Sequence, residues 1–235
     1  MKPLRENAGV FVEIGRVPAG ILDYAVASVD DYLNYENEFN GGYHSLQRHC
    51  LIILHEIYGL NRHIETTAGL LETAGYAVCC PNLLGRPAFD YDQADQAYAH
   101  FYRTVGLATA AEQARRLILA KSATYERVSL VGYSVGATVA WLCSALPLHL
   151  HRMVGFYGSR IRDYREIRPQ CPTLLLLAQE TSFPVAELAE ALAGQANVRT
   201  EVFPARHGFA DPFGKGYDPG AALRARELMM DFLGS

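Results

Sequence analysis

The sequence predicts an α/β protein built on a doubly wound, mostly parallel sheet with helices on both faces. Two features of its 235 residues indicate this class. From residue 50 onward, short continuous apolar runs alternate with segments of helix length. The runs show no polar alternation, which is typical of strands that helices cover on both faces. Such strand–helix alternation, joined by right-handed crossovers, produces a single open sheet.

The expected elements follow in order along the chain. Two short β-type runs, 9–15 and 21–28, open it, and residues 30–49 are expected to form a long turn or a hairpin tip. The core strands are expected at 50–56, 76–82, 127–133, 152–158, 173–179 and 198–204. The covering helices are expected at 62–75, 93–121, 135–146, 184–195 and 219–233. Asp218 and Pro219 predict the start of the last helix, because an Asp cap precedes proline at the first helical position.

Composition excludes several classes of protein. The formal charge is −4, from 21 basic and 25 acidic residues, and no long run of one sign is present, so the basic stripe of a nucleic-acid binder is missing. No apolar run approaches the roughly 18 residues of a membrane-spanning helix. The first residues also lack the apolar core of a signal peptide. We therefore expect a cytoplasmic protein of one domain, residues 1–235, that binds neither nucleic acid nor membrane; its oligomeric state is not predicted.

The cysteines are expected to be buried thiols. Their number, five, is odd, and most of them lie inside apolar runs, as is typical of a reducing compartment. The adjacent Cys79 and Cys80 would point to opposite faces of a strand, so they do not form a zinc-binding pair.

The most specific motif is Gly132–Tyr133–Ser134–Val135–Gly136, which directly follows one predicted strand and directly precedes a predicted helix. This is the setting of a nucleophile elbow, in which a sharp turn lifts a serine hydroxyl above the sheet. The helix amino terminus offers N–H groups and a positive dipole end to an oxyanion. An idle serine in a close-packed turn is the alternative interpretation.

A catalytic serine needs a base, and His207 is the best candidate among eight histidines. It alone lies after the last predicted strand, which matches the chain order of nucleophile, acid and histidine in this kind of site. His55 ends a core strand and is expected to be a packed or hydrogen-bonded core residue.

These motifs resemble the dienelactone hydrolase family of α/β-hydrolases over roughly residues 50–233. The matching segments are LHEIYGLN (54–61), GYAVCCPNL (75–83), GYSVGA (132–137) and RHGFA (206–210). The resemblance implies an α/β-hydrolase fold. The first of these segments is the most specific, since general lipases carry a glycine-rich loop at that place.

The resemblance also implies roles for individual residues. Glu56 matches a glutamate that interacts with the resting nucleophile. The backbone N–H groups of Ile57 and Val135 match the oxyanion hole, and Arg86 matches an arginine that receives a substrate carboxylate. Tyr133, next to the nucleophile, is a further candidate for substrate binding. For Glu56 and Arg86 the alternative is a solvated surface side chain.

The chain departs from the family pattern at three places. Ser134 stands where the family usually has cysteine, so the site depends more on its histidine. Thr181 stands about where the family has its aspartate, and Glu180, one residue earlier, is the nearest carboxylate. Glu180 would serve if the loop is shifted or its longer side chain makes up the distance; otherwise a neutral group would hold His207. Asp211 lies where a second arginine is usual, and it would repel an anionic substrate.

The sequence therefore predicts a hydrolase of small carboxylic esters or lactones that works through an acyl-enzyme on serine. The resemblance implies neither a cofactor nor a metal, and no inserted segment is long enough for a lipase lid. A peptidase or a cofactor-free peroxidase would be another activity on this fold. A non-catalytic binding or regulatory protein that kept the fold is the alternative from a different class.

Overall fold

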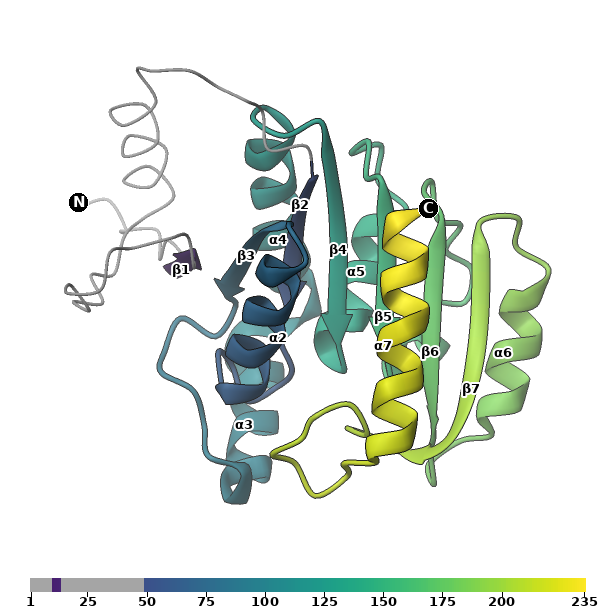
Figure 1. The fold of residues 1–235 in the computed structure, drawn as a ribbon. Helices are drawn as coiled ribbons and strands as arrows, with labels where there is room; N and C mark the ends of the chain where they lie inside the picture. Colours follow the sequence, from purple (N-terminus) through teal and green to yellow (C-terminus); the bar gives the residue numbers. More distant parts are fainter. Residues whose placement is uncertain (1–9, 14–48) are drawn as a thin grey trace, which may run out of the picture.

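The computed structural model describes residues 10–13 and 49–235, which form a seven-stranded sheet (Figure 1). The strands are β1 (Val10–Glu13), β2 (His49–Leu54), β3 (Ala77–Asn82), β4 (Arg127–Tyr133), β5 (Arg152–Phe156), β6 (Thr173–Gln179) and β7 (Val198–Arg206). Their order across the sheet is β1-β3-β2-β4-β5-β6-β7. β1 pairs antiparallel with β3, and all the other neighbours are parallel. The predicted mostly parallel sheet is confirmed.

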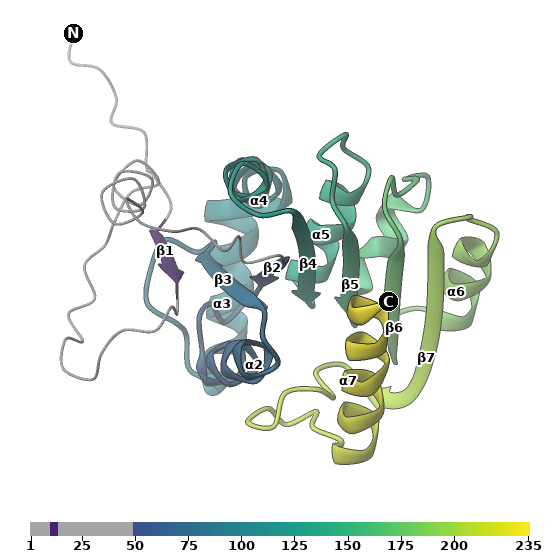
Figure 2. The same ribbon diagram turned by 45° about the horizontal axis from the view of Figure 1, so that its top comes forward.

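Helices cover both faces of this sheet (Figures 1 and 2). The helices are α2 (Arg62–Thr73), α3 (Ala94–His100), α4 (Gly106–Ser122), α5 (Val135–Ser144), α6 (Val185–Ala193) and α7 (Pro219–Gly234). α2 and α7 lie on one face, whereas α4, α5 and α6 lie on the other. The core is split accordingly, because side chains of a strand alternate between faces. Leu51 and Ile53 belong to the cluster under α2 and α7, whereas Ile52 and Leu54 belong to the opposite cluster.

The prediction of a single long helix at 93–121 is wrong. The structure has a 3₁₀ turn at Tyr91–Gln93, then α3, a five-residue π-helical turn at Phe101–Val105, and then α4. Gly106 begins α4 with a φ of +75°, which a helix interior does not accept and which glycine adopts readily. The apolar periodicity continues across this break, so the pattern alone did not reveal it.

Other expectations are met within the described residues. β1 lies inside the predicted run 9–15, whereas the run 21–28 and the turn 30–49 lie outside the described residues. The Asp218 carboxylate accepts from the N–H of Ala221 at 2.9 Å and caps α7, with Pro219 at the first helical position. All five cysteines are buried thiols. None of the helices in the described ranges combines the length and the apolar character that a membrane crossing needs.

Candidate active site

The carboxyl ends of the parallel strands bring three of the candidate residues together. Ser134 directly follows β4, Glu180 directly follows β6, and His207 directly follows β7. β4 and β6 each pair with β5, and β6 also pairs with β7. Open α/β sheets bind ligands at this edge, and the three side chains form one hydrogen-bonded chain there.

The turn that carries Ser134 has the geometry of a nucleophile elbow. Ser134 has a φ of +54°, which is rare for a residue with a side chain. Its N–H donates to the carbonyl oxygen of Phe156 at the end of β5, at 2.9 Å. A Cβ at Gly132 would collide with the backbone of Gly136, and a Cβ at Gly136 would collide with the carbonyl oxygen of Leu54. Both glycines of the motif are therefore required by close backbone approach.

His207 lies between the serine and a carboxylate. The Nε2 atom of His207 lies 2.9 Å from the Oγ of Ser134, and its Nδ1 atom lies 2.6 Å from the Oε1 of Glu180. A carboxylate can only accept, so Nδ1 carries the proton and Nε2 accepts from the serine hydroxyl. The Glu180 side chain is 15% exposed and that of His207 is 38% exposed. The arrangement has the order of a serine, histidine and carboxylate triad.

An irregular register between β6 and β7 explains why Glu180 can replace a residue at position 181. Ala178 pairs with Phe203, but the next residue of β6, Gln179, pairs with Arg206. β7 therefore advances three residues while β6 advances one, as in a bulge that re-aims the following side chain. Glu180 and His207, the next residues on the two strands, come together, whereas Thr181 is exposed. This register shift is one of the two conditions under which Glu180 is expected to serve, and its catalytic role remains a prediction.

The backbone groups expected to form an oxyanion hole lie on adjoining segments. Val135 is the first residue of α5, so its N–H has no acceptor within the helix. Ile57 follows β2 and is partly buried. The close approach of Gly136 to the carbonyl oxygens of Leu54 and His55 brings the start of α5 against the end of β2. This packing brings together the two segments that carry these N–H groups, and their role remains a prediction.

Glu56 is buried, with 5% of its surface exposed, and is not the solvated side chain of the alternative interpretation. Its Oε1 accepts from the Tyr157 hydroxyl at 2.9 Å, and the ring of Tyr157 lies 5.0 Å from that of His207. Burial raises the pKa of Glu56; the His63 charge and the Tyr157 hydrogen bond oppose this, and the Asp211 charge adds to it. The predicted contact with the resting serine remains a prediction.

His55 is a core residue that holds two loops, as expected. Its Nε2 accepts from the N–H of Leu83 at 2.9 Å, so its proton is on Nδ1, which donates to the carbonyl oxygen of Glu56 at 2.6 Å. Burial lowers the pKa of His55 to about 4. The neutral ring ties the loop after β2, which carries Glu56 and Ile57, to the loop after β3.

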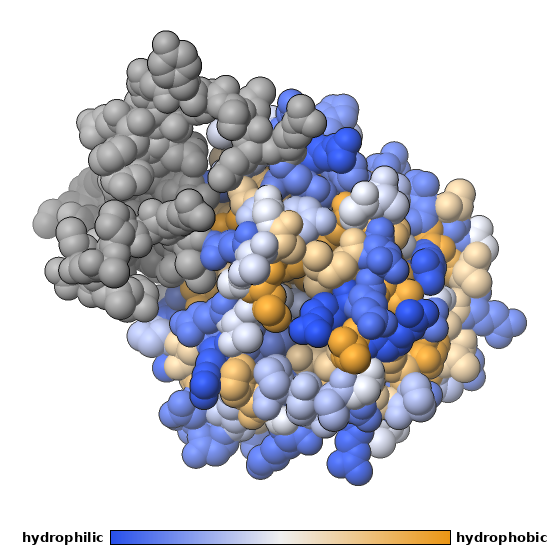
Figure 3. Space-filling view, in the orientation of Figure 1, coloured by the Kyte–Doolittle hydropathy of each residue, from blue (hydrophilic) through white to orange (hydrophobic). Residues whose placement is uncertain are grey.

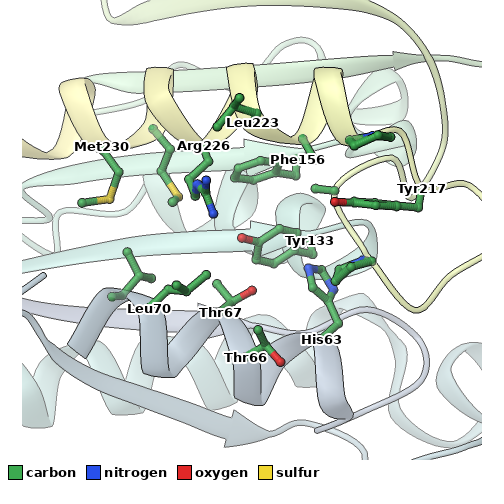
Figure 4. Close-up of a pocket in the computed structure, with 16 residues that line it drawn as sticks. His63, Thr66, Thr67, Leu70, Tyr133, Phe156, Tyr217, Leu223, Arg226 and Met230 are labelled. Atoms are coloured by element: carbon green, nitrogen blue, oxygen red, sulfur yellow. The ribbon is translucent and has the colours of Figure 1, made fainter. Parts of the chain in front are cut away.

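The two candidate substrate-binding side chains are not part of the triad. The guanidinium of Arg86 stays within its own loop, where it lies 3.6 Å from the ring centre of Phe89 and donates to the carbonyl oxygen of Pro87. Tyr133 is 3% exposed and stacks on Phe156 with ring centres 4.6 Å apart. Its hydroxyl end faces a cavity on the side of α2 and α7 (Figure 4). Substrate binding by either residue remains a prediction.

This cavity has a volume of about 490 Å³ and lies between α2 and α7, where apolar and hydrophilic side chains surround a hollow in Figure 3. Figure 4 shows Thr67, Leu70 and His63 on the α2 side, facing Leu223 and Arg226 on the α7 side. The volume is in the range of small-molecule sites.

Sequence reasoning missed three residues near the site. Tyr157 binds Glu56, Tyr91 donates to Asp211 at 2.5 Å, and the ring of His63 packs against Tyr133. Tyr157 follows β5 at the same carboxyl edge as Ser134, so its position could have indicated it. His63 lies within the helix expected at 62–75, and no local signal distinguishes it from a surface histidine.

Comparison with known proteins shows the family to which the chain is similar. The model of the dienelactone hydrolase family matches residues 41–235. The chain is 38% identical to the uncharacterized protein YczH of Bacillus subtilis (strain 168) over 166 residues, which are 69% of this chain and 81% of that protein. It is 29% identical to a carboxymethylenebutenolidase of Pseudomonas putida over 199 residues, covering 78% and 84% of the two chains.

A solved structure supports the fold in particular. The dienelactone hydrolase-like promiscuous phosphotriesterase from metagenomic libraries aligns with a TM-score of 0.63 and 20% sequence identity, over 81% of this chain and 87% of that one. The predicted α/β-hydrolase fold is confirmed.

Proposed function

Because this chain belongs to the dienelactone hydrolase family, we propose that it hydrolyses small carboxylic esters or lactones with Ser134 as its nucleophile. The family and the carboxymethylenebutenolidase relative support a hydrolase. The observation that carries the proposal is the hydrogen-bonded chain from Ser134 through His207 to Glu180, at 2.9 Å and 2.6 Å.

In the acylation step, His207 Nε2 takes the hydroxyl proton of Ser134 as its Oγ attacks the acyl carbon. Glu180 accepts the Nδ1–H of His207, which holds the ring in the required tautomer and stabilises the imidazolium. The positive φ of Ser134 holds the hydroxyl above the sheet edge. The proton then passes from His207 to the leaving alkoxide, and Ser134 is left as an ester of the acyl group.

The tetrahedral oxyanion would accept from the N–H groups of Ile57 and Val135, each such donor lowering the barrier by about 3 kcal/mol. In the second half of the reaction, His207 activates a water molecule that attacks the acyl-enzyme, and the acid product leaves. The first and second halves use the same base, so loss of His207 affects both. We propose that substrates are small molecules and that catalysis occurs within one domain.

A non-catalytic binding protein on this fold is the alternative. Its main support was the displaced acid, since a histidine without a carboxylate partner would be a poor base. The 2.6 Å contact between His207 and Glu180 removes that support. Hydrolysis is therefore the better interpretation.

The proposal is tested with p-nitrophenyl acetate and a fluorophosphonate probe. The parent protein is expected to hydrolyse the ester and to be labelled once per chain, because the hydroxyl of Ser134 is activated by His207. Ser134→Ala is expected to lose both. Ser182→Ala is the matched control, since Ser182 lies in an exposed loop beyond Glu180 and should keep both properties. Labelling and hydrolysis that persist in Ser134→Ala would overturn the assignment.

A further inference from the structure

A second group of polar side chains lies at the same edge of the sheet. Glu56 follows β2, His63 is in the first turn of α2, and Asp211 is in the segment between β7 and α7. They are 5%, 2% and 2% exposed, respectively. One oxygen or nitrogen atom from each lies within 4.8 Å of the other two.

Among the described residues, the two carboxylates have only neutral hydrogen-bond donors. The Tyr157 hydroxyl donates to Glu56 at 2.9 Å, the Tyr91 hydroxyl donates to Asp211 at 2.5 Å, and the N–H of Phe213 donates to Asp211 at 2.9 Å. Within the described part of the chain, no lysine or arginine forms an ion pair with either carboxylate. Two buried carboxylates this close repel each other unless a cation or a proton lies between them.

His63 supplies an independent observation. Its Nδ1 atom is buried and has no hydrogen-bond partner among the described residues. The nearest acidic atom, Oδ2 of Asp211, is 3.9 Å away, beyond hydrogen-bond range. Buried polar atoms are nearly always partnered in native proteins, by protein, water or an ion. The ring therefore has an unused nitrogen 3.9 Å from one carboxylate, in a cluster that also contains Glu56.

We propose that Glu56, His63 and Asp211 bind a divalent first-row metal ion such as Mn²⁺ or Zn²⁺. One imidazole nitrogen and two carboxylate oxygens form a ligand set that these ions accept. Metal–ligand bonds of about 2.0–2.2 Å place ligand atoms about 3–4 Å apart, so small side-chain movements would close the site. The ion's charge balances both carboxylates, and Tyr91 and Tyr157 act as outer hydrogen-bond partners that orient them.

The site has an entry path, which a functional metal site requires. His63 lines the cavity between α2 and α7, together with Ala210 and Pro212, the chain neighbours of Asp211. Figure 4 shows His63 at the edge of this cavity, beside Tyr133. The cavity therefore gives an ion a route to the His63 side of the cluster, at the face covered by α2 and α7. The proposal does not depend on the nucleophile assigned to Ser134.

The test measures binding of Mn²⁺ to the full chain after treatment with a chelator, by the loss of the free-ion electron paramagnetic resonance signal. One Mn²⁺ per chain is expected, displaced by added Zn²⁺. His63→Gln and Asp211→Asn each remove a ligand and should weaken binding by more than about 100-fold, the upper end of the cost of losing an outer partner. Tyr91→Phe, which removes only such a partner, should weaken it about 10–100-fold.

The matched control is His151→Gln. The rings of His49 and His151 lie 5.1 Å apart, close enough for this pair to hold an adventitious ion. This control, and Ser134→Ala, should bind Mn²⁺ like the parent, so loss of esterase activity and loss of metal binding are separate results. Far-ultraviolet circular dichroism reports whether the His63 and Asp211 variants fold. If they do not fold, Mn²⁺ binding by Tyr91→Phe is the test of the proposal.

Three results would overturn the proposal. The first is the absence of saturable binding of one Mn²⁺ per chain in the parent. The second is unchanged binding in the folded His63 and Asp211 variants, or in Tyr91→Phe if they do not fold. The third is loss of binding in His151→Gln, which would mark the ion as adventitious.

Discussion

Two polar clusters lie at the carboxyl edge of the sheet and differ in how their atoms are partnered. In the triad, Ser134, His207 and Glu180 form a line in which each contact is a short hydrogen bond of 2.9 or 2.6 Å. In the cluster of Glu56, His63 and Asp211, the carboxylates bind tyrosine hydroxyls, and the Nδ1 atom of His63 has no partner among the described residues.

The difference shows what each arrangement can do. A line of donor, base and acceptor moves a proton in one direction, and it remains open to substrate because His207 is partly exposed. The cluster of two carboxylates and an imidazole contains no hydroxyl–imidazole–carboxylate line along which a proton could move, and its side chains are more buried than those of the triad. It concentrates negative charge, and such charge is tolerated only when it is protonated or paired with a cation. Tyr157 connects the two clusters, since it binds Glu56 and packs against His207.

The largest effect is expected from Glu180→Gln, which interrupts the line at its acceptor end. The amide cannot accept and hold the His207 proton as a carboxylate does, so kcat should fall by a factor on the order of 10³–10⁴ while folding is nearly unchanged. Steady-state hydrolysis of p-nitrophenyl acetate measures it. Thr181→Val is the control and should stay close to the parent. A loss of less than about threefold in Glu180→Gln would leave Ser134 and His207 as a dyad.

Gly136→Ala tests the backbone on which the triad depends. The new Cβ would collide with the carbonyl oxygen of Leu54, so β2 and α5 would have to separate, at a cost of about 3 kcal/mol of unfolding free energy. Urea denaturation measures it. Gly194→Ala is the matched control, since its Cβ would meet nothing within 4 Å. Equal stability of the two variants would contradict the close approach of β2 and α5.

Tyr157→Phe distinguishes the contact of Tyr157 with Glu56 from its contact with His207. It removes the hydrogen bond to Glu56 but keeps the ring that packs on His207, so unfolding free energy should fall by about 1–3 kcal/mol because a buried carboxylate loses its donor. Loss of that donor should also raise the pKa of Glu56 further, since the hydrogen bond favours the charged form. Tyr217→Phe, at an exposed tyrosine, should leave stability unchanged. No loss in Tyr157→Phe would mean that the hydrogen bond contributes little.

The smallest effect concerns acid sensitivity at the opposite end of the strands. Burial, together with the charges of His151, Arg127 and Arg152, lowers the pKa of His49 to about 4. As the pH falls, His49 is protonated in the unfolded chain, near pH 6.5, before it is protonated in the folded protein. The folded state is therefore not penalised by His49 above about pH 6.5, and it loses stability relative to the unfolded chain as the pH falls from 6.5 towards 4. His49→Gln should therefore flatten the decline of stability between pH 6.5 and 4, as measured by urea denaturation. Equal slopes in parent and variant over that range would contradict the shift, whereas equal slopes at pH 7–8 are expected.

Much of the fold could be predicted because its signals are local. Apolar runs without polar alternation located five core strands, a β-type run located β7, and the Asp218–Pro219 pair located the start of α7. The helix predicted at 93–121 failed because Gly106 breaks the backbone without breaking the apolar pattern. The boundaries of the other strands and helices within the described residues differ from the prediction by no more than two residues, as is usual at element ends.

The candidate site divides in the same way. Ser134 and His207 were predicted because a nucleophile elbow and the histidine after the last strand are marked by position along the chain. The sequence does not determine whether Glu180 or a neutral group is the partner of His207, since the register between β6 and β7 cannot be predicted from sequence alone. The cluster of Glu56, His63 and Asp211 was not foreseen as a unit, because its members come from three separate parts of the chain.

The sequence by itself determined the alternation of strands and helices, the glycines around Ser134 and the order of serine, carboxylate and histidine. These features depend on neighbouring residues, whose spacing the sequence states directly. The tertiary structure decided that β7 advances by two extra residues opposite Gln179, which brings Glu180 to His207. It also decided that His63 would lie beside two buried carboxylates, with its Nδ1 atom unpartnered among the described residues. Both results depend on how distant segments pair and pack, and no local pattern encodes the distance between them.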